Sequence, residues 1–335
     1  MSQKSFRTAI NEALRQEMER DPDILLIGED IAGGIGGKGE EDAWGGVMGV
    51  TKGLLGAFGP DRVLDTPISE TAYIGAAVGA AAAGLRPVAE LMFCDFLGVC
   101  FDQVMNQAAK FRYMFGGKAS MPLVIRMQVG AGFSASAQHS QTLHSLLTHI
   151  PGLKVVMPST PYDAKGLLIE AIRDNDPVMF LENKVMYDDA GEVPDDAYTL
   201  PIGIANVTRS GDDVTIVGFG RMANFANDAA DQLAKNGIAA TVIDLRSSSP
   251  LDEETILESL EETGHLVVVD EGNPRCGLAA DIAALAATRG LHALEAPVKL
   301  VTPPHTPVPF APVLEGLYLP SPERIVTAVR EVLEA

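Results

Sequence analysis

A single carboxylate, Glu70, stands between an apolar extended run and a helical stretch made almost wholly of alanine and glycine. Ser69 is placed to cap that helix, so a carboxylate at its first position would gain about 0.3–1 kcal/mol from the helix dipole. The neighbours Ile68, Tyr73 and Ile74 favour a second role, because an apolar wall prepares a carboxyl group to share a proton with a buried partner. On these residues alone, capping and proton sharing both stay open.

Histidines at His139, His144 and His149 recur every five residues, whereas neighbours on one helix face are three or four residues apart. The spacing therefore does not predict a shared metal site, since zinc ligands favour an i, i+4 pair or clustered Cys and His. His139 differs, because it lies in a loop of small residues after an expected strand, where parallel sheets bind ligands. An imidazole titrates near neutrality, so proton handling and simple capping are both hypotheses for His139.

Two glycine patterns resemble nucleotide-binding turns. Gly34, Gly36 and Gly39 have GxGxxG spacing, but the acidic run of residues 40–42 follows where a helix start should cradle phosphate, so a surface loop is predicted. The second pattern is "GFGRMA", residues 218–223, which fits GxGxxA between a strand and a helix. Asp244 ends the next strand, as a ribose acceptor would. An NAD-dependent dehydrogenase and a plain tight turn both fit this second pattern.

The elements that must position these residues alternate between strands and helices, which is the rhythm of parallel α/β sheets. A first run of strand-like segments is "DILLIGEDI", "RVLDTPI", "PVAELMF", "PLVIRMQ", "LKVVMPS" and "PVMFLEN", with helices near 6–18, 70–83, 97–115, 141–149 and 160–174. The first helix has Ser5 as its candidate cap. The sequence predicts an α/β fold of two unequal domains with mainly parallel sheets.

A second alternation begins after residues 188–203, an acidic stretch with Pro and Gly that has neither helical nor strand periodicity. Its expected elements are "DVTIVGFG", "AATVIDLRS" and "HLVVVDEG", with helices near 222–236, 252–263, 277–289 and 322–334. We therefore predict domains at 1–187 and 204–335, joined by a linker at 188–203.

The charge balance excludes some partners. With 25 Lys plus Arg against 45 Asp plus Glu, the formal charge of −20 repels nucleic acid and anionic membrane surfaces. Cys94, Cys100 and Cys276 form no CxxC pair, which is typical of reduced thiols. The longest apolar run is too short for a membrane span, and the first residues lack a signal-peptide core, so a cytoplasmic protein is expected.

Several segments together resemble one family along nearly the whole chain: "VLDTPISE", "GAAVGAAAAGLRPVAELMF", "FDQVMNQAAKFRYMFGGK", "SAQHSQ", "PGLKVV" and "AIRDNDPV". This family comprises the β subunits of the thiamine-diphosphate-dependent E1 component of 2-oxo acid dehydrogenase complexes. "EDAWGGVMGVTKGL", "LMFCDFLGVCFDQV" and "DEGNPRCGLAADIAAL" most resemble its acetoin dehydrogenase branch. The resemblance implies a transketolase-like fold with a pyrimidine-binding domain followed by a transketolase C-terminal domain.

The resemblance also implies roles for particular residues. Glu70 matches the glutamate that hydrogen-bonds N1′ of the cofactor's aminopyrimidine, which favours the imino tautomer able to remove the thiazolium C2 proton. Phe96 matches the ring that stacks on the aminopyrimidine, with Met92 and Ile68 as apolar neighbours. His139 matches a histidine near the substrate end. Some relatives hold potassium at positions matched by Leu123, Ala171, Asp174 and Asp176, where Asp176 replaces an Asn.

One motif of thiamine-diphosphate enzymes is absent from the sequence. The GDG motif that holds the diphosphate through Mg²⁺ does not occur, and the resemblance implies that an E1 α subunit carries this half of the site. An α2β2 assembly and a lipoyl-bearing E2 acyltransferase are the implied partners. The implied reaction cleaves acetoin, releases acetaldehyde and passes an acetyl-level fragment to lipoyl-E2. Pyruvate or a branched 2-oxo acid as substrate is the nearest alternative, and an NAD-dependent dehydrogenase or a noncatalytic scaffold are more distant ones.

Overall fold

The computed structural model describes residues 1–33 and 45–335, and the GxGxxG pattern at Gly34–Gly39 lies outside the described residues. The chain forms two compact units. Unit 1 comprises Met1–Val129, Leu146–Val156 and Thr160–Ile202, and unit 2 comprises Gly130–Ser145, Met157–Ser159 and Gly203–Ala335. The domain limits predicted from the sequence stay a prediction.

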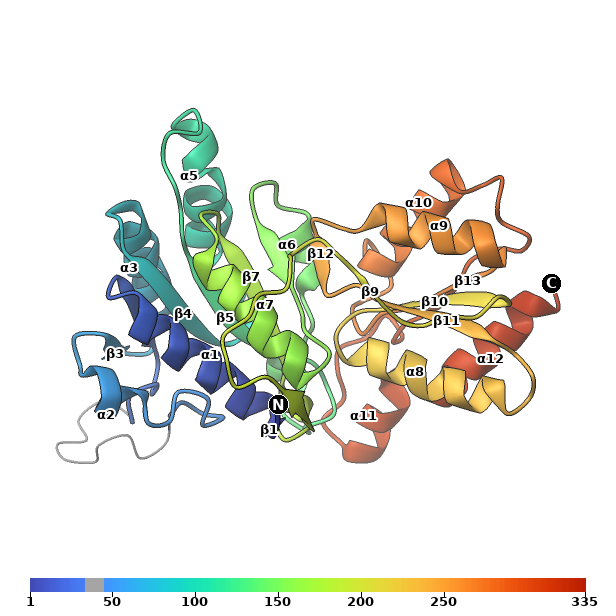
Figure 1. Ribbon diagram of the computed structural model, residues 1–335, viewed down its shortest axis with the longest axis horizontal. Coiled ribbons are helices and arrows are strands. Elements are labelled where there is room, and N and C mark those ends of the chain that lie inside the picture. Colours follow the sequence, from blue (N-terminus) through green and yellow to red (C-terminus); the bar gives the residue numbers. More distant parts are fainter. Residues whose placement is uncertain (34–44) are drawn as a thin grey trace. The chain divides into compact units, whose positions relative to one another are not determined.

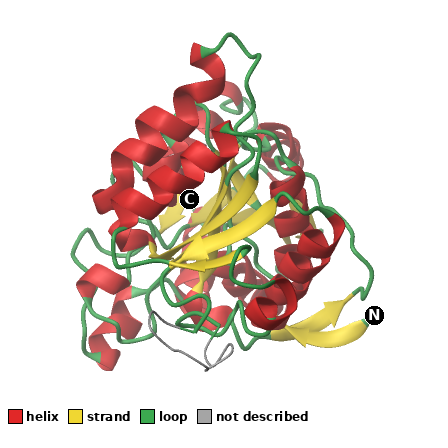
Figure 2. Cartoon of the chain, turned by 90° about the vertical axis from the view of Figure 1, so that its left-hand side faces the viewer, coloured by secondary structure: helices red, strands yellow, loops and turns green. Residues whose placement is uncertain are grey.

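Unit 1 is an α/β layer structure with a parallel sheet at its centre. Its elements are β1 (Ser2–Ser5), α1 (Phe6–Arg20), β2 (Ile24–Gly28), α2 (Leu54–Phe58), β3 (Val63–Asp65), α3 (Glu70–Ala82), β4 (Arg86–Phe93), α4 (Leu97–Asp102), α5 (Ala109–Met114), β5 (Val124–Val129), β6 (Lys154–Val156), α7 (Pro161–Arg173), β7 (Val178–Asn183) and β8 (Ala190–Val193). The central strands follow the order β6–β7–β5–β4–β2–β3, and all are parallel. Helices cover both faces of this sheet (Figure 2).

The core of unit 1 is formed where α1 and α7 press aliphatic side chains against the sheet. Phe6, Ile10 and Leu14 of α1 are fully buried, together with Leu167 and Leu168 of α7. Helical spacing places these residues on one face, and their burial provides the main driving force for folding. The predicted cap is confirmed, because the Ser5 side chain accepts a hydrogen bond from the Thr8 amide.

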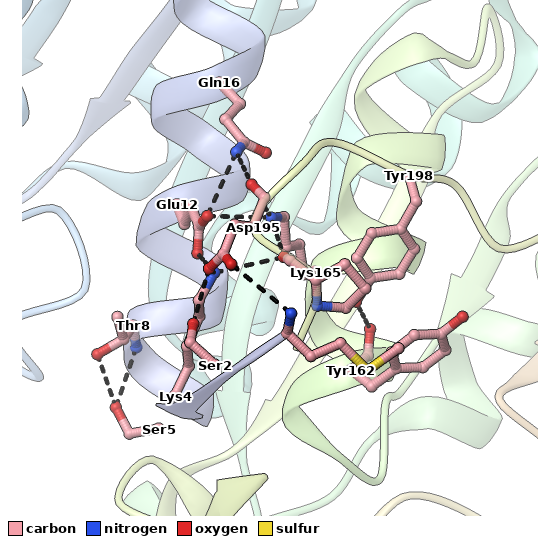
Figure 3. Close-up of polar contacts among 12 residues, drawn as sticks. Ser2, Lys4, Ser5, Thr8, Glu12, Gln16, Tyr162, Lys165, Asp195 and Tyr198 are labelled. Atoms are coloured by element: carbon pink, nitrogen blue, oxygen red, sulfur yellow. Dashed lines mark hydrogen bonds and ion pairs between the residues drawn. The ribbon is translucent and has the colours of Figure 1, made fainter. Parts of the chain in front are cut away.

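The stretch predicted as an aperiodic linker contains a strand. β8 pairs antiparallel with β1, with Ser2 opposite Val193. Beside this pair, the buried Lys165 ammonium donates to the carbonyl oxygens of Pro194 and Asp195 at 2.7 and 3.1 Å and lies 3.1 Å from Glu12 Oε1 (Figure 3). The segment is therefore fixed to α1 and α7 of unit 1.

Unit 2 repeats the α/β alternation around a smaller sheet. Its elements are β9 (Asn206–Arg209), β10 (Val214–Gly218), α8 (Arg221–Ala234), β11 (Ala240–Asp244), β12 (Ser247–Ser249), α9 (Glu253–Thr263), β13 (Leu266–Val269), α10 (Leu278–Arg289), β14 (Lys299–Val301), α11 (Pro312–Tyr318) and α12 (Pro322–Leu333) (Figure 1). The strand order is β14–β13–β10–β11–β9, in which only β9 runs antiparallel to its neighbour among the described pairs. The predicted fold class is confirmed in both units.

Two predicted helices differ from the structure. The stretch expected at 97–115 is divided by a π-helical segment, Gln103–Ala108, between α4 and α5. The stretch expected at 141–149 is shorter, because α6 covers only His144–Thr148 and contains residues of both units. The carbonyl of Gln141 instead accepts a hydrogen bond from the Gly130 amide. No helix among the described residues is long and apolar enough to cross a bilayer.

Candidate active site

The candidate residues of unit 1 lie at the carboxyl edge of its parallel sheet. β3, β2 and β4 are neighbours, and Gly28 at the end of β2 pairs with Asp65 and Glu90. Glu29 directly follows β2, Glu70 follows β3 after a short loop, and Phe96 follows β4. Parallel strands bring their carboxyl ends to one edge, which is where open α/β sheets bind ligands.

Glu70 is the first residue of α3, and its side chain is buried, with the residue 7% exposed. Ser69 occupies the N-cap position as predicted, but its side chain makes no capping hydrogen bond. The acidic group in the first turn of α3 is therefore Glu70 itself, in the favourable field of the helix start. A carboxylate buried at the edge of a sheet where ligands bind is consistent with the proton-sharing role.

Glu29 is a second buried carboxylate that the sequence reasoning missed. Burial raises the pKa of Glu29, and the nearby charge of Glu70 raises it further. The Tyr73 hydroxyl is close enough to favour ionisation of Glu29, yet neither this hydroxyl nor Glu29 Oε1 makes a hydrogen bond of good geometry within the described residues. A charged residue directly after a buried strand was the signal that could have found it.

The same edge holds two further titratable groups whose ionisation is suppressed. Burial and then the charges of Glu29 and Glu70 raise the pKa of the Tyr73 hydroxyl well above its usual range. Burial and the charge of Glu70 raise the pKa of the Cys100 thiol to about 12. Both groups stay neutral at physiological pH. Such a cluster can share a proton with a nitrogen base that enters the site.

Three residues, Phe96, Met92 and Ile68, are expected to meet the cofactor ring, and they lie at or just after the end of β4 or just before α3. Phe96 ends a 3₁₀ turn, is half-buried, and meets Phe93 edge-on at 5.8 Å between ring centroids. The Thr71 hydroxyl donates to the Val99 carbonyl at 2.6 Å, which ties the first turn of α3 to α4. Met92 is half-buried near the end of β4, and Ile68 is 84% exposed. An apolar side chain this exposed, two residues before a buried carboxylate, leaves an uncovered surface beside the cluster.

His139 belongs to unit 2, whereas Glu70 belongs to unit 1. His139 ends a short 3₁₀ turn, Ala137–His139, and is half-buried. Its sequence neighbours Gln138 and Ser140 line a cavity of about 420 Å³, together with Glu271 and residues of the 305–308 segment. The histidine loop therefore borders a cavity large enough for a small molecule.

The positions matched to a potassium site already have partners. The Asp174 carbonyl accepts a hydrogen bond from Arg86 at 2.6 Å, and the Leu123 carbonyl accepts one from the Val178 amide at 2.9 Å. The Ala171 carbonyl accepts from the Asp174 amide at 3.3 Å. Each of these carbonyl oxygens thus already accepts one hydrogen bond.

The carboxylates at this corner are also paired. The Asp176 side chain contacts Arg112 at 2.6 Å and Lys154 at 3.8 Å, and Lys154 also pairs with Asp174. Positive side chains thus already balance the two carboxylates. Among the described residues, no group of three or more His, Cys, Asp or Glu side chains could hold a metal ion.

The second glycine pattern forms a tight turn packed against other residues of unit 2. Gly220 has φ +56°, and a Cβ atom there would lie 2.7 Å from the Met157 side chain. Asp244 is fully buried and accepts from the Ser159 hydroxyl at 2.5 Å and from the Arg246 amide at 3.1 Å. An acidic residue held in this way is not presented to a ribose, so the geometry favours the tight-turn interpretation.

Comparison with known proteins decides the family. Residues 2–189 match the transketolase pyrimidine-binding domain, and residues 203–325 match the transketolase C-terminal domain. The acetoin:2,6-dichlorophenolindophenol oxidoreductase subunits beta of Cupriavidus necator and Bacillus subtilis are 63% and 59% identical, each over 98% of this chain and 97% of the relative. The chain belongs to the transketolase-like E1 beta-subunit family. It is the beta subunit of a thiamine-diphosphate-dependent oxidoreductase, and an alpha partner is implied.

Other E1 beta subunits and one solved structure are more distant. The 2-oxoisovalerate dehydrogenase subunit beta of Bacillus subtilis is 43% identical over the full length of both chains. A solved chain described as a split-gene transketolase in an inactive beta4 tetramer covers 98% of each chain with a TM-score of 0.78 and 24% identity. At that identity the likeness concerns the fold alone. The transketolase-like fold of this E1 beta subunit is thus found again in a sequence that has diverged widely.

Proposed function

We propose that this chain is the beta half of an E1 enzyme that cleaves acetoin, with Glu70 holding a proton against N1′ of the thiamine diphosphate aminopyrimidine. The carbon–carbon bond between the carbonyl and the carbinol carbons of acetoin breaks, and acetaldehyde leaves. The remaining two-carbon fragment is oxidised to an acetyl group as it reduces the lipoyl disulfide of an E2 acyltransferase and becomes its thioester. Bound thiamine diphosphate supplies the carbon nucleophile for this chemistry.

The observation that carries the proposal is the burial of Glu70 beside two other buried polar groups, Glu29 and Tyr73. Glu29 Oε1 and the Tyr73 hydroxyl are buried without hydrogen bonds of good geometry in the described residues. Buried polar groups are ordinarily paired, and an aminopyrimidine offers ring and exocyclic nitrogens as partners. The residues present therefore fit the pyrimidine half of the cofactor.

The remaining residues would bind and shield the ring. Phe96 offers a half-buried aromatic face on which a flat heterocycle can stack. Met92 and Ile68 would supply apolar contacts that exclude water and strengthen the interaction between Glu70 and a ring nitrogen. His139 would handle a proton at the substrate end, from a loop that borders a cavity of unit 2.

An alpha subunit would complete the site, because the diphosphate-holding GDG motif and its Mg²⁺ ligands are absent from this sequence. Support comes from α3, where small side chains are exposed at helical spacing, namely Ala72, Ala76, Gly79 and Ala83. Small residues allow another backbone to approach closely. Ile68 is also exposed and precedes Glu70 by two residues in the chain. We infer a cytoplasmic α2β2 assembly that works with a lipoyl-bearing E2.

Potassium has the least support among the groups that the family resemblance implies. Oxygens of Asp174 and Asp176 already meet Arg86, Arg112 and Lys154, so the local charge at these two positions opposes a further cation. No step of the proposed reaction depends on potassium. Unfolding midpoints that are equal in KCl and NaCl would agree with this assignment.

Acetoin is preferred over a 2-oxo acid because the acetoin relatives are 63% and 59% identical and the 2-oxoisovalerate relative 43%. A panel of acetoin, pyruvate and 2-oxoisovalerate would decide between them. The co-purified alpha–beta enzyme is assayed by reduction of 2,6-dichlorophenolindophenol, the acceptor in the relatives' names. Turnover with a 2-oxo acid but not with acetoin would overturn the substrate assignment.

The role of Glu70 is tested by Glu70→Gln, which keeps the shape of the side chain but removes the shared acid proton. We expect turnover to fall by about 100-fold or more, in the upper range for general acid–base groups, while association with the alpha chain is unchanged. The matched control is Glu253→Gln, since Glu253 is the first residue of α9 and its side chain is 45% exposed. Retained activity in Glu70→Gln would refute the assigned role.

A further inference from the structure

The loop that carries His139 has an unusual backbone. Gly130 and Gly132 have φ values of +97° and +103°, and two non-glycine residues, Ser134 and Ser136, have φ values of +54° and +62°. Left-handed conformations are costly for residues with a Cβ atom, and they persist only where surrounding contacts hold them. Something outside the loop must therefore fix its path.

Glu315 of α11 provides such contacts from more than 170 residues away in the chain. One carboxylate oxygen accepts the Gly132 amide at 2.7 Å. The other accepts the Ser134 amide at 2.9 Å and the Ser134 hydroxyl at 3.2 Å. Glu315 is only 2% exposed, and all of these residues belong to unit 2.

A second buried carboxylate continues the pattern. The Ala131 amide donates to Glu271 Oε1 at 2.7 Å, and Glu271 is 6% exposed in the turn after β13. The amides of residues 131, 132 and 134 thus meet carboxylates from two separate parts of unit 2. Both oxygens of a carboxylate are acceptors, whereas an amide side chain offers one acceptor oxygen and an apolar side chain none.

The helix that carries Glu315 buries a carboxylate and exposes several apolar side chains. Its buried residues are Glu315 and Tyr318, whereas Val313, Leu314 and Leu317 are exposed, as is Phe310 just before the helix. Burying a carboxylate is costly unless its oxygens are satisfied, and packing alone would favour an apolar residue there. The acceptor function towards the loop accounts for an acid at this position.

We propose that Glu315 is a positioning residue, which holds the 131–139 backbone so that His139 is presented at the edge of the 420 Å³ cavity, with Glu271 as its second anchor. The inference rests on the proposed function for the part played by His139. It assigns no contact between Glu315 and substrate or cofactor. Its effect passes through the backbone of the loop.

The test compares Glu315→Gln with wild type in the co-purified alpha–beta enzyme. An amide replaces one acceptor oxygen by a donor, so one loop amide loses its partner. Hydrogen exchange should accelerate at least tenfold in peptides covering 130–140 and not elsewhere. kcat with acetoin should fall by about 10- to 100-fold, the scale of a 1 Å misplacement, with little change in KM.

Two further variants separate positioning from general destabilisation. Asp252→Asn replaces one of the two oxygens that accept the Ala205 and Thr255 amides at the start of α9 by a donor, away from the loop, and should leave both loop exchange and kcat unchanged. Ser134→Ala removes only the 3.2 Å hydroxyl contact and should raise loop exchange by a smaller factor than Glu315→Gln does.

Three outcomes would overturn the inference: unchanged loop exchange in Glu315→Gln, accelerated exchange with unchanged kcat, or equal losses of kcat in Glu315→Gln and Asp252→Asn. A wild-type enzyme without acetoin turnover would count against the proposed function alone. In that case the exchange comparison would still decide whether Glu315 orders the loop.

Discussion

Glu29 and Glu70 are two buried carboxylates at one edge of a parallel sheet, and the charge of Glu70 is second only to burial in raising the pKa of Glu29. The charge of Glu70 therefore opposes ionisation of Glu29. A ligand that brings a basic nitrogen between them would relieve the repulsion. The free energy of unfolding of the isolated chain should reflect this repulsion between the two carboxylates.

Replacing Glu29 with Gln should make the isolated chain more stable at high pH than at low pH, relative to wild type. A raised pKa in the folded state means that the native protein binds more protons than the unfolded chain above the ordinary value of 4.5. Wild-type stability from this group is thus present at low pH and lost as pH rises through the folded pKa. Unfolding midpoints measured from pH 5 to pH 8 would show the gap between Glu29→Gln and wild type widening. Parallel curves, like those expected for the exposed Glu19→Gln, would contradict the coupling.

Arg126 should be required for the stability of unit 1. Its guanidinium is 2% exposed, binds Glu182 with two hydrogen bonds of 2.6 and 2.7 Å, and binds Glu90 at 2.7 Å. Arg126→Met would leave two buried carboxylates without their cation, which costs about 3–5 kcal/mol in comparable cases. Urea unfolding should report this loss, whereas Arg289→Ala, which removes an exposed ion pair, should cost less than about 1 kcal/mol. A loss of the same small size in both variants would show that the network contributes little.

Enlarging Gly79 should block assembly without harming the chain itself. A Cβ atom at Gly79 would meet nothing within 4 Å, and the residue lies on the exposed small-residue face of α3. Gly79→Leu should leave the free energy of unfolding equal to wild type or raise it by about 0.5–1 kcal/mol, because Gly is a poor helix former. Co-purification with the alpha chain should drop at least tenfold. Ala287→Leu, an equivalent change on α10, should retain association, and normal binding by Gly79→Leu would exclude this face as the contact.

Local patterns were sufficient to predict the long, regular elements. The amphipathic spacing of α1 and its Ser5 cap are encoded within a few residues, as are the apolar runs of β4, β5 and β7. Short strands such as β8 and β14 were missed, because three or four residues carry little periodicity and depend on distant partners. Helix α11 was missed because apolar residues of the helix are exposed and one of its two buried residues is the carboxylate Glu315.

The site shows the same division. Glu70 stood out because a carboxylate before an Ala- and Gly-rich helix is visible in the sequence itself. Glu29 became a candidate only when the sheet order placed β2 beside β3, about 40 residues later in the chain. The anchors of the histidine loop, Glu271 and Glu315, are still farther away in sequence. Contacts of that range follow from tertiary packing, which single-residue patterns do not encode.

The pairing of β1 with β8 has a consequence for biosynthesis. Ser2 lies opposite Val193, so β1 must wait for nearly two hundred further residues to be synthesised before its ladder with β8 can close. Until then β1 offers an open strand edge to neighbouring chains. The time that separates the synthesis of β1 from that of β8 therefore sets how long this edge stays unpaired.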